Sequence, residues 1–520
     1  MPESDAVQQP AAGTATGIEF TEERVGCYTG LFEARAAVAK PESVDELREI
    51  FRLARESGRR VTIRGGGHSF DAQPIGNDIV ISTERLNSIE LLEGDRVRVG
   101  PGAPWGSIFA ATQPHGLVPA VTVTTEHATP GGTLSADCLS RFSMAYGKEG
   151  TRVESFELLT TEGELLQCSA PPAEADWEDL TRAQRAFRGA IGGFGYLGAI
   201  VSITYRLLRV EGAREGGKIG VRSFAREYES FDRLTRDLVP ATEQAYHEAS
   251  DPNDPQKLDA IWSAIIPSGG RKRFLFFTSA FTPKSERRRL IQHRPKLLLR
   301  IPFEWLMRAG WSSRLLWSLI FRLGFRSDEY VDDLEGFTFF MDGNARAKRA
   351  GKAFGFSMRN IQQTFVVPFD PQGAGWQAGH DSLVEWLDTA QRLLEERGLT
   401  PTLYDVLFLP GDEPFLMSST AAGGGFAVSY AFETSRRATL QGAQEAFSDL
   451  SEILWEKFGG RVHLVKNVFA TKRTLAEMYG DSAKRFLALK DELDPAGILR
   501  NDFLERTFGD LATADAAQPN

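Results

Sequence analysis

Cysteine is scarce in this chain of 520 residues, which holds Cys27, Cys138 and Cys168 and no others. Their spacing matches neither a metal site nor a disulfide framework, so we expect no bound metal and a reducing, cytoplasmic location. Long apolar runs are missing as well, and we therefore expect no bilayer-spanning helix. A basic excess is also missing, because the net charge is -10, and this argues against nucleic acid as a partner.

Residues 1–20 lack an apolar core segment and contain much Ala, Gln, Thr and Gly. We expect a disordered leader here rather than a signal peptide, and a short tail at 511–520. The rest of the chain has ordinary globular composition, with 42% hydrophobic and 25% charged residues overall. Its length allows two or more hydrophobic cores.

A glycine-rich turn follows a short apolar strand at residues 61–70, which read VTIRGGGHSF. Its three glycines allow a tight turn whose N–H groups can approach a bulky anion. His68 follows directly, so an imidazole would lie beside that anion. The pattern predicts a diphosphate cofactor whose ring lies within reach of His68. The alternative is a glycine-rich surface turn with a solvated histidine.

A second small-residue loop, TPGGTLSADCL, occupies residues 129–139. Free N–H groups in such a segment can hold the other side of a pyrophosphate. Considered alone, this loop is better interpreted as a close-packed turn that enters a helix. A third motif, GFGYLG at 193–198, matches G-x-G-x-x-G. It follows an expected helix and precedes an expected strand, which is the wrong order for a Rossmann nicotinamide site.

Hydrophobic periodicity predicts a chain of mixed helices and strands. Ser43 and Glu46 form a capping box that opens a helix ending at Gly58, within a βαβ unit. The expected strands are 34–39, 61–64, 78–82, 96–99, 199–205, 361–368, 402–409, 426–432 and 461–467, with a hairpin at 156–165. The other expected helices are 105–115, 182–191, 381–397 and 438–457.

In these motifs the sequence resembles the FAD-linked oxidases of the vanillyl-alcohol-oxidase type. The resemblance rests on the His68 loop, the 129–139 loop, and a closing segment at 494–504 preceded by an H-x-x-K pattern at 463–466. It implies an α+β fold with a PCMH-type, two-subdomain FAD-binding domain and an inserted α+β substrate (cap) domain. The implied boundaries are 21–211 for the FAD-binding domain, 212–459 for the cap, and 460–510 for a C-terminal return to the FAD-binding domain.

The resemblance also implies FAD as the cofactor and assigns residues to its site. Lys466 aligns with a lysine that decaprenylphosphoryl-ribose oxidases place over the flavin, and Gln362 with a cap glutamine that can hydrogen-bond a substrate hydroxyl. These two are the candidate catalytic residues, although Lys466 could instead be an exposed edge-strand lysine. The candidate FAD contacts are Arg64, Gly65, Gly66, Gly67, His68, Ser69, Thr129, Pro130, Gly131, Gly132, Ser135, Cys138, Leu139, Ile200 and His463.

Family members with a histidine at the position of His68 often bond it covalently to the flavin 8α-methyl group. Lactone and alditol oxidases have this histidine and the ribose oxidases lack it. The cysteine of doubly attached flavins would fall at Thr124–Thr125, so at most one covalent bond is expected. Two cap positions of the ribose oxidases fall on Ala427 and Phe408, which weakens the expectation of a prenyl-phosphoryl ribose substrate.

The implied reaction is hydride transfer to flavin N5 from a CH–OH group of a sugar, polyol, lactone or lipid-linked sugar. One alternative is a sterol or lipid C=C redox enzyme of the side-chain-reductase type, and another is a peripheral membrane flavoprotein without catalysis. Residues 284–326 hold eleven Lys or Arg, two Glu and three Trp. Such a segment suits a membrane surface or a lipid-bearing substrate, or a lid that packs on its own domain.

Overall fold

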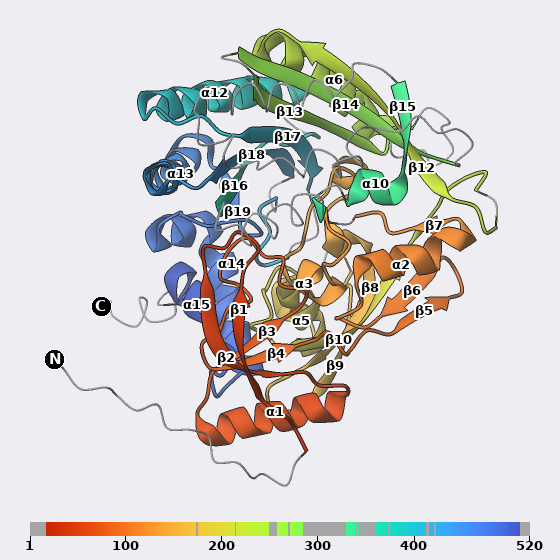
Figure 1. Cartoon of the computed structure of the whole chain (residues 1–520), viewed down its shortest axis with the longest axis vertical. Coiled ribbons are helices and arrows are strands. Elements are labelled where there is room, and N and C mark those ends of the chain that lie inside the picture. Colours follow the sequence, from red (N-terminus) through yellow and green to blue (C-terminus); the bar gives the residue numbers. More distant parts are fainter. Residues whose placement is uncertain are drawn as a thin grey trace, which may run out of the picture.

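The computed structural model describes residues 17–509 except 122, 173–174, 214, 249–256, 269–270, 284–328, 340, 343–358, 373–374, 412–414 and 421–422. The basic segment 284–326, residues 1–16 and the tail at 511–520 therefore lie outside the described residues. The described residues form an α+β fold with two smaller sheets and one large sheet, together with a short two-stranded pairing (Figure 1). In the described part of the chain, no helix is both long and apolar enough to cross a bilayer.

The first sheet contains the strand that leads into the glycine turn. Its order is β1 (Thr21–Gly26), β2 (Glu33–Ala39), β4 (Ile79–Ser82) and β3 (Val61–Arg64). Helix α1 (Val44–Ser57) connects β2 to β3, and both strands run parallel to β4, which lies between them. The predicted βαβ unit therefore forms, and the glycine turn leaves its second strand.

The predicted cap of α1 forms in a modified way. The Ser43 hydroxyl accepts a hydrogen bond from Glu46 N at 3.2 Å, as expected. The Glu46 carboxylate, however, accepts from Glu42 N at 2.8 Å rather than from Ser43 N, so the reciprocal half of the capping box is shifted by one residue. Gly58 ends the helix with φ 65°, which glycine adopts without strain.

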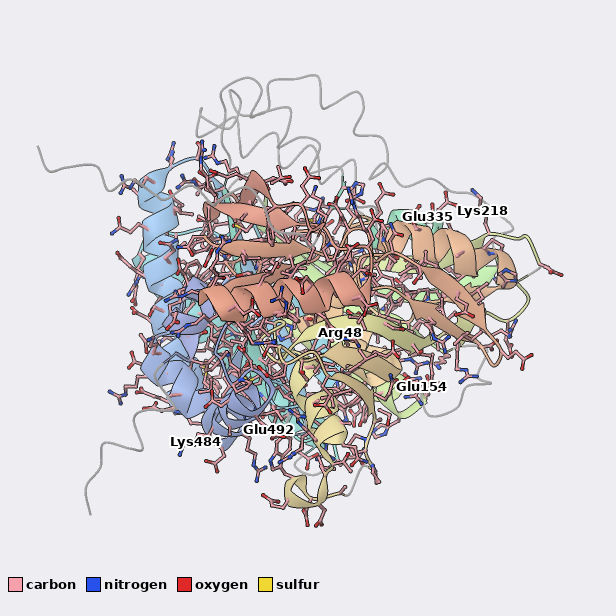
Figure 2. All side chains as sticks on the ribbon, turned by 90° about the horizontal axis from the view of Figure 1, so that it is seen from below. Arg48, Glu154, Lys218, Glu335, Lys484 and Glu492 are labelled. Carbon is pink, nitrogen blue, oxygen red and sulfur yellow. The ribbon has the colours of Figure 1, made fainter. Side chains whose placement is uncertain are left out.

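The second sheet is antiparallel, with the order β5 (Ile89–Leu92), β6 (Arg96–Val99), β10 (Ala199–Arg206), β8 (Val153–Leu159) and β9 (Leu165–Ser169). Arg48 of α1 donates to the Gly163 carbonyl at 3.0 Å, so α1 reaches the β8–β9 turn (Figure 2). Helix α5 (Arg182–Ala190) precedes the GFGYLG segment and β10 follows it. This order confirms that the motif joins a helix to a strand and does not open a dinucleotide-binding helix.

The large sheet lies above the two smaller ones in Figure 1 and has eight strands in the described residues. Their order is β15 (Glu329–Asp333), β12 (Ile219–Tyr228), β14 (Arg271–Pro283), β13 (Ala260–Ser268), β17 (Leu403–Pro410), β18 (Gly424–Thr434), β16 (Arg359–Pro368) and β19 (Arg461–His463). Helices α6 (Phe231–Glu248), α12 (Gly375–Glu396) and α13 (Arg437–Phe458) pack against it. Phe365 of β16 meets Trp386 of α12 at 5.1 Å between ring centroids, so the alternate residues Gln362, Thr364 and Val366 face away from the helices.

The end of the chain returns to the first sheet. Val61 N donates to Ile498 O at 2.7 Å, and α14 (Lys472–Leu493) and α15 (Asp502–Thr507) flank this contact (Figure 1). The predicted strand 461–467 is only partly right, because β19 ends at His463 and residues 464–466 form a turn. Lys466 therefore lies on a turn beyond the strand rather than on its edge.

Candidate active site

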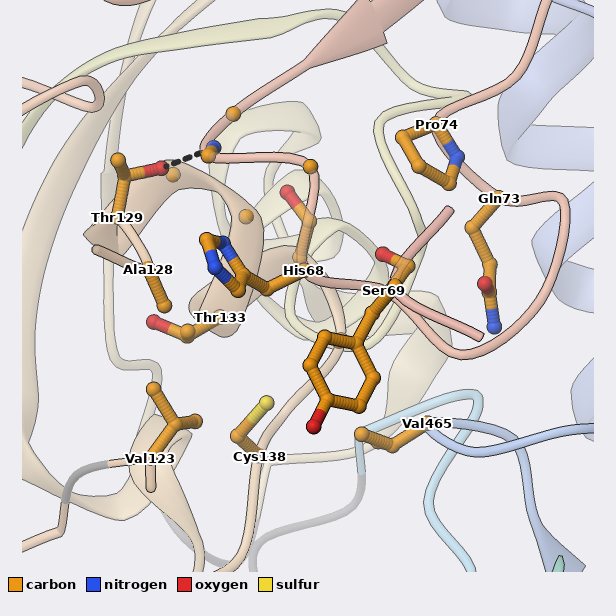
Figure 3. A pocket seen from close by; sticks show the side chains of 18 of the residues that line it. His68, Ser69, Gln73, Pro74, Val123, Ala128, Thr129, Thr133, Cys138 and Val465 are labelled. Carbon is orange, nitrogen blue, oxygen red and sulfur yellow. Dashed lines mark hydrogen bonds between the residues drawn. The ribbon is translucent and has the colours of Figure 1, made fainter. Parts of the chain in front are cut away.

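A large cavity lies between the glycine turn after β3, the short helix α3 (Pro130–Ser135) and the turn after β19 (Figure 3). Its lining includes Gly65–Phe70, Ala128–Thr129, Ser135–Ala136, Cys138 and Val465–Lys466. Its empty volume is about 1220 Å³, including open space at the mouth. Because its lining combines these separate segments, an extended ligand in the cavity could contact all of them at once.

The glycines of the first turn are required by the close approach of the second loop. A Cβ atom on Gly65 would lie 2.4 Å from Thr129 Oγ1, and one on Gly66 would lie 2.3 Å from the His127 carbonyl oxygen. Gly66 N donates to Thr129 Oγ1 at 3.3 Å, which joins the two loops directly (Figure 3). Gly67 has φ +70°, a conformation that other residues adopt only with strain.

Replacing Gly66 with alanine should therefore push the two loops apart. Overpacking of this kind costs about 1–3 kcal/mol, and we expect a lower Tm and cofactor affinity weakened by roughly tenfold or more. Gly442→Ala, within α13, is the matched control. A Cβ atom on Gly442 would lie 3.6 Å from the Leu399 side chain, which is an ordinary van der Waals distance. A Gly66→Ala protein that unfolds and binds cofactor like the parent would show that the loops need no such contact.

The backbone donors of the two loops differ from the prediction. Gly131 N is bonded to Pro101 O at 2.9 Å and Gly132 N to Thr129 O at 3.0 Å, so these donors in the second loop are occupied. The N–H groups of Gly67, His68 and Ser69 make no hydrogen bond within the described residues. The available donors therefore belong mainly to the first turn, where successive N–H groups suit an anionic group.

The His68 imidazole lines the cavity. Burial lowers the pKa of His68, and the nearby His127 lowers it further, against smaller opposing contributions from Gly66 and Asp342. The His68 ring lies between those of Tyr28 and His127, with centroid distances of 6.3 and 6.1 Å. Its Nδ1 atom is buried and makes no hydrogen bond within the described part of the chain. An unprotonated ring nitrogen of this kind is a nucleophile.

Lys466 lines the same cavity from the far end of the chain. Its Nζ atom lies 3.9 Å from the centroid of the Phe70 ring, two residues after His68. Burial lowers the pKa of Lys466, while the acidic groups Cys138 and Asp405 oppose the shift. The imidazole at 68 and the amine at 466 thus share one cavity, and the amine is more easily deprotonated than an exposed lysine.

Comparison with known protein families identifies the first part of this site. Residues 35–169, which include both loops, match the FAD binding domain family. The chain carries a PCMH-type FAD-binding domain. Residues 409–507, which include Lys466, match the D-arabinono-1,4-lactone oxidase family.

The individual relatives that match the chain include proteins named as oxidases or dehydrogenases. Decaprenylphosphoryl-beta-D-ribose oxidase of Mycolicibacterium smegmatis is 34% identical over 170 residues, which are 32% of this chain and 35% of that protein. Cytokinin dehydrogenase 4 of Oryza sativa is 30% identical over 39% of this chain and 37% of that protein. L-Gulonolactone oxidase of Bos taurus is 22% identical over 90% of this chain and 94% of that protein. The chain thus spans about a third of the first relatives and nearly all of the last.

These matches show a domain of an FAD-binding family, whose cofactor is FAD. The residues present fit this cofactor on three independent observations. The N–H groups of residues 67–69 make no hydrogen bond within the described residues and suit the pyrophosphate. The contact between the loops leaves no room for side chains on Gly65 and Gly66. The buried Nδ1 atom of His68 has no hydrogen-bond partner among the described residues. FAD supplies the two-electron chemistry, and the protein supplies its orientation and electrostatic environment.

A network of buried polar side chains fixes Lys466 against the FAD-binding loop. Asn467 Nδ2 donates to Phe70 O at 2.8 Å, and Val468 N donates to Asp71 Oδ2 at 3.0 Å. Gln73 Nε2 donates to Leu464 O at 3.0 Å. Asn467 also exchanges two backbone-directed bonds with Gln362 of β16, at 2.8 and 2.9 Å. The same asparagine therefore connects the flavin loop, the lysine turn and the large sheet.

The structure gathers most, but not all, of the candidate FAD contacts at the cavity. Those that line it are Gly65, Gly66, Gly67, His68, Ser69, Thr129, Gly131, Gly132, Ser135, Cys138 and Ile200, together with Lys466. Outside its lining are Arg64, Pro130, Leu139, Gln362 and His463.

Three of these outlying residues have contacts elsewhere. Arg64 donates to Gly26 O at 3.0 Å, and His463 is buried with its Nδ1 3.0 Å from Ser419 Oγ. Leu139 packs against an apolar cluster of the large sheet that includes Val366 and Leu407. A role for these residues would therefore be to support the cavity rather than to line it.

The sequence did not single out several residues that the structure brings to the cavity. They are Tyr28, Phe70, Thr133, Met341, Asp342 and Val465, among others. Phe70 and Thr133 belong to the two loops and could have been included on that ground. Asp342 could not, because it reaches the site through Thr125 Oγ1, at 2.5 Å, from a segment 217 residues away.

Proposed function

We propose that this protein oxidises a CH–OH group of a sugar, polyol, lactone or lipid-linked sugar by hydride transfer to flavin N5. The observation that carries the proposal is the half-buried Lys466 at the cavity that also holds His68. The match of residues 409–507 to the D-arabinono-1,4-lactone oxidase family supports a substrate of this class. So does the likeness to L-gulonolactone oxidase over 90% of the chain.

In this proposal Lys466 manages the proton of the substrate hydroxyl. That proton must leave as the hydride departs, and a neutral amine with lowered pKa can accept it at Nζ. In its charged form the same amine stabilises negative charge on the reduced ring. Phe70 below the amine, and Asn467 beside it, hold the group in place.

His68 and Gln362 have different proposed roles. His68 would hold the flavin through a covalent bond to a ring nitrogen, because burial lowers the pKa of the ring and its Nδ1 makes no hydrogen bond within the described residues. Gln362 hydrogen-bonds a substrate hydroxyl, since it belongs to the β16 face that points away from the covering helices. Its backbone bonds to Asn467 place it next to the Lys466 turn.

Anaerobic bleaching of the bound flavin tests the substrate class. The FAD-loaded protein would be mixed with D-arabinono-1,4-lactone, L-gulono-1,4-lactone, xylitol and a prenyl-phosphoryl ribose, and its visible absorption followed. Bleaching by at least one CH–OH donor is expected. Oxidation of the dithionite-reduced protein by an unsaturated sterol, without bleaching by any donor, would favour the C=C redox alternative. If the protein shows neither of these two reactions, the result would favour a flavoprotein without catalysis.

We further propose that residues 21–211 and 460–510 form the FAD-binding part and residues 212–459 the cap. We also propose a cytoplasmic enzyme that contacts an anionic membrane surface through the basic and aromatic segment 284–326. Flotation of the full chain with vesicles of anionic and of neutral lipid tests this contact. Binding to anionic vesicles that weakens with salt is expected, and a protein that stays at the bottom of the gradient would contradict it.

A further inference from the structure

A buried carboxyl group lies behind the cavity wall, outside the machinery described so far. Glu149, in the 3₁₀ turn Glu149–Arg152, is 1% exposed. Its Oε1 atom accepts hydrogen bonds from Thr133 Oγ1 at 2.9 Å and from Tyr205 OH at 2.6 Å. Its Oε2 atom is buried and makes no hydrogen bond within the described residues.

Glu149 is one residue layer away from the cofactor cavity. Thr133 and Cys138 both line the cavity, and Glu149 contacts each of them. Trp105 Nε1 donates to Thr133 Oγ1 at 3.1 Å. The Thr133 hydroxyl in turn donates to Glu149 Oε1 at 2.9 Å, with Pro130 O as a more distant acceptor at 3.4 Å. Glu149 N donates to Cys138 O at 2.9 Å. A charge on Glu149 would therefore act on a ligand in the cavity across a wall one residue thick.

No basic side chain forms an ion pair with Glu149 in the part of the chain that the structure describes. The adjacent Lys148 pairs instead with Asp137, at 2.5 Å, and donates to Ser418 Oγ at 3.1 Å. Asp137 has a second donor in Gly150 N at 3.0 Å. The buried Lys148 is thus paired with Asp137, and an ionised Glu149 would have no paired counter-charge among the described residues.

The titratable groups that face Glu149 also disfavour its ionised form. Asp137 and Cys138 follow α3, Lys148 precedes the 3₁₀ turn, and Tyr205 faces it from β10. Burial raises the pKa of Glu149 to about 8, Asp137 adds to the rise, and the bonds from Tyr205 and Thr133 oppose it. Burial also keeps Tyr205 protonated, because it raises the pKa of that phenol well above its ordinary value. A carboxyl kept in so unfavourable a place is a candidate for function.

We propose that Glu149 is a positioning residue that binds a proton when the flavin behind Thr133 and Cys138 is reduced. Two electrons and one proton convert the neutral oxidised ring to a negatively charged reduced ring. That negative charge repels an ionised Glu149, so Glu149 takes a second proton from solvent and becomes neutral. The reductant is the substrate in turnover or dithionite in an equilibrium titration. The reduced ring and Glu149 together then carry one negative charge instead of two.

The pH window follows from the pKa of about 8. Below it, Glu149 already holds its proton in the oxidised protein, and reduction takes up one proton for each electron pair. Above it, Glu149 is ionised in the oxidised protein and protonated in the reduced one, so uptake rises to two protons for each electron pair. Ionised Glu149 also makes the flavin harder to reduce, because like charges oppose each other.

The test is the pH dependence of the flavin midpoint potential, measured by dithionite titration with mediator dyes between neutral pH and about pH 10. We expect the slope to double above about pH 8 in the parent protein and to stay constant in Glu149→Gln. Tyr205→Phe removes a hydrogen bond that favours the ionised form of Glu149. The pH at which the slope changes should therefore be higher in Tyr205→Phe than in the parent protein. Because the reductant is dithionite, the result does not depend on the identity of the substrate.

A constant slope in the parent protein, or a break that persists in Glu149→Gln, would overturn the proposal. The persisting break would then belong to another group, such as Lys466. Should Glu149→Gln fail to fold, infrared difference spectra of the parent protein at about pH 9 decide the matter. Reduction should produce the C=O band of a protonated carboxylic acid, and the absence of that band would also overturn the proposal.

Discussion

Replacing Lys466 with methionine should leave FAD bound and slow the reduction of the flavin by substrate about 100- to 10,000-fold. Methionine keeps the length and apolar stem of the side chain but loses the cation–π contact of Nζ with the Phe70 ring. It has no nitrogen to accept the hydroxyl proton or to stabilise the reduced ring. Anaerobic stopped-flow mixing, with the flavin absorption as signal, measures this rate without interference from the step that reoxidises the flavin.

Two further variants separate the roles of the amine. Lys466→Arg keeps the positive charge but cannot be deprotonated near neutral pH. Flavin reduction should therefore be slow in this variant if Lys466 acts as a base, and fast if it acts only through its charge. Lys472→Met, at an exposed position six residues further on, is the matched control and should react like the parent. Full-speed reduction in Lys466→Met would remove Lys466 from the mechanism.

The pH profile gives an independent check on the same residue. Burial lowers the pKa of Lys466 from its ordinary value of 10.5, so the neutral amine appears at lower pH than in an exposed lysine. If the neutral amine is the base, the rate of flavin reduction rises with pH and levels off above this lowered pKa. A rate that instead falls as Lys466 loses its proton would assign the amine an electrostatic role.

Replacing His68 with asparagine should abolish the covalent flavin completely. Acid precipitation of the parent should leave yellow colour in the pellet, and its mass should exceed that of the chain by one FAD. In His68→Asn the colour should move to the supernatant and the mass should fall to that of the chain. The variant should still bind FAD, because Gly65, Gly66 and Thr129 keep the two loops together.

His127→Asn is the matched control for this experiment. His127 is exposed and its ring lies 6.1 Å from that of His68, so the variant changes a neighbouring imidazole without touching the proposed linkage. It should keep the flavin in the pellet. Colour in the supernatant of the parent protein would instead show that His68 holds FAD without a bond.

Local patterns in the sequence predicted much of the framework of the site. The cap and apolar face of α1, the strand before the glycine turn and the helix–glycine–strand order around 193–198 all depend on contacts close in sequence. Such contacts leave periodic or positional signals that a single sequence carries. The closeness of the two glycine loops came from the family resemblance, and their atomic contacts explain why glycine is needed.

The position of Lys466 shows why the rest could not be predicted. The alternation in residues 461–467 fits a strand, but the chain leaves the sheet after His463. Beyond it, Gln73 and Asp71 hydrogen-bond the backbone of Leu464 and Val468. These partners are separated by more than 390 residues in sequence, so no local periodicity reports them.

A crystal structure of the FAD-loaded protein tests the central claim most directly. We expect the pyrophosphate at the N–H groups of residues 67–69, and the isoalloxazine ring against both His68 and Lys466. The same crystals would show whether density is continuous between His68 and the ring. A ring bound away from either residue, or a protein that stays colourless after incubation with FAD, would contradict the account.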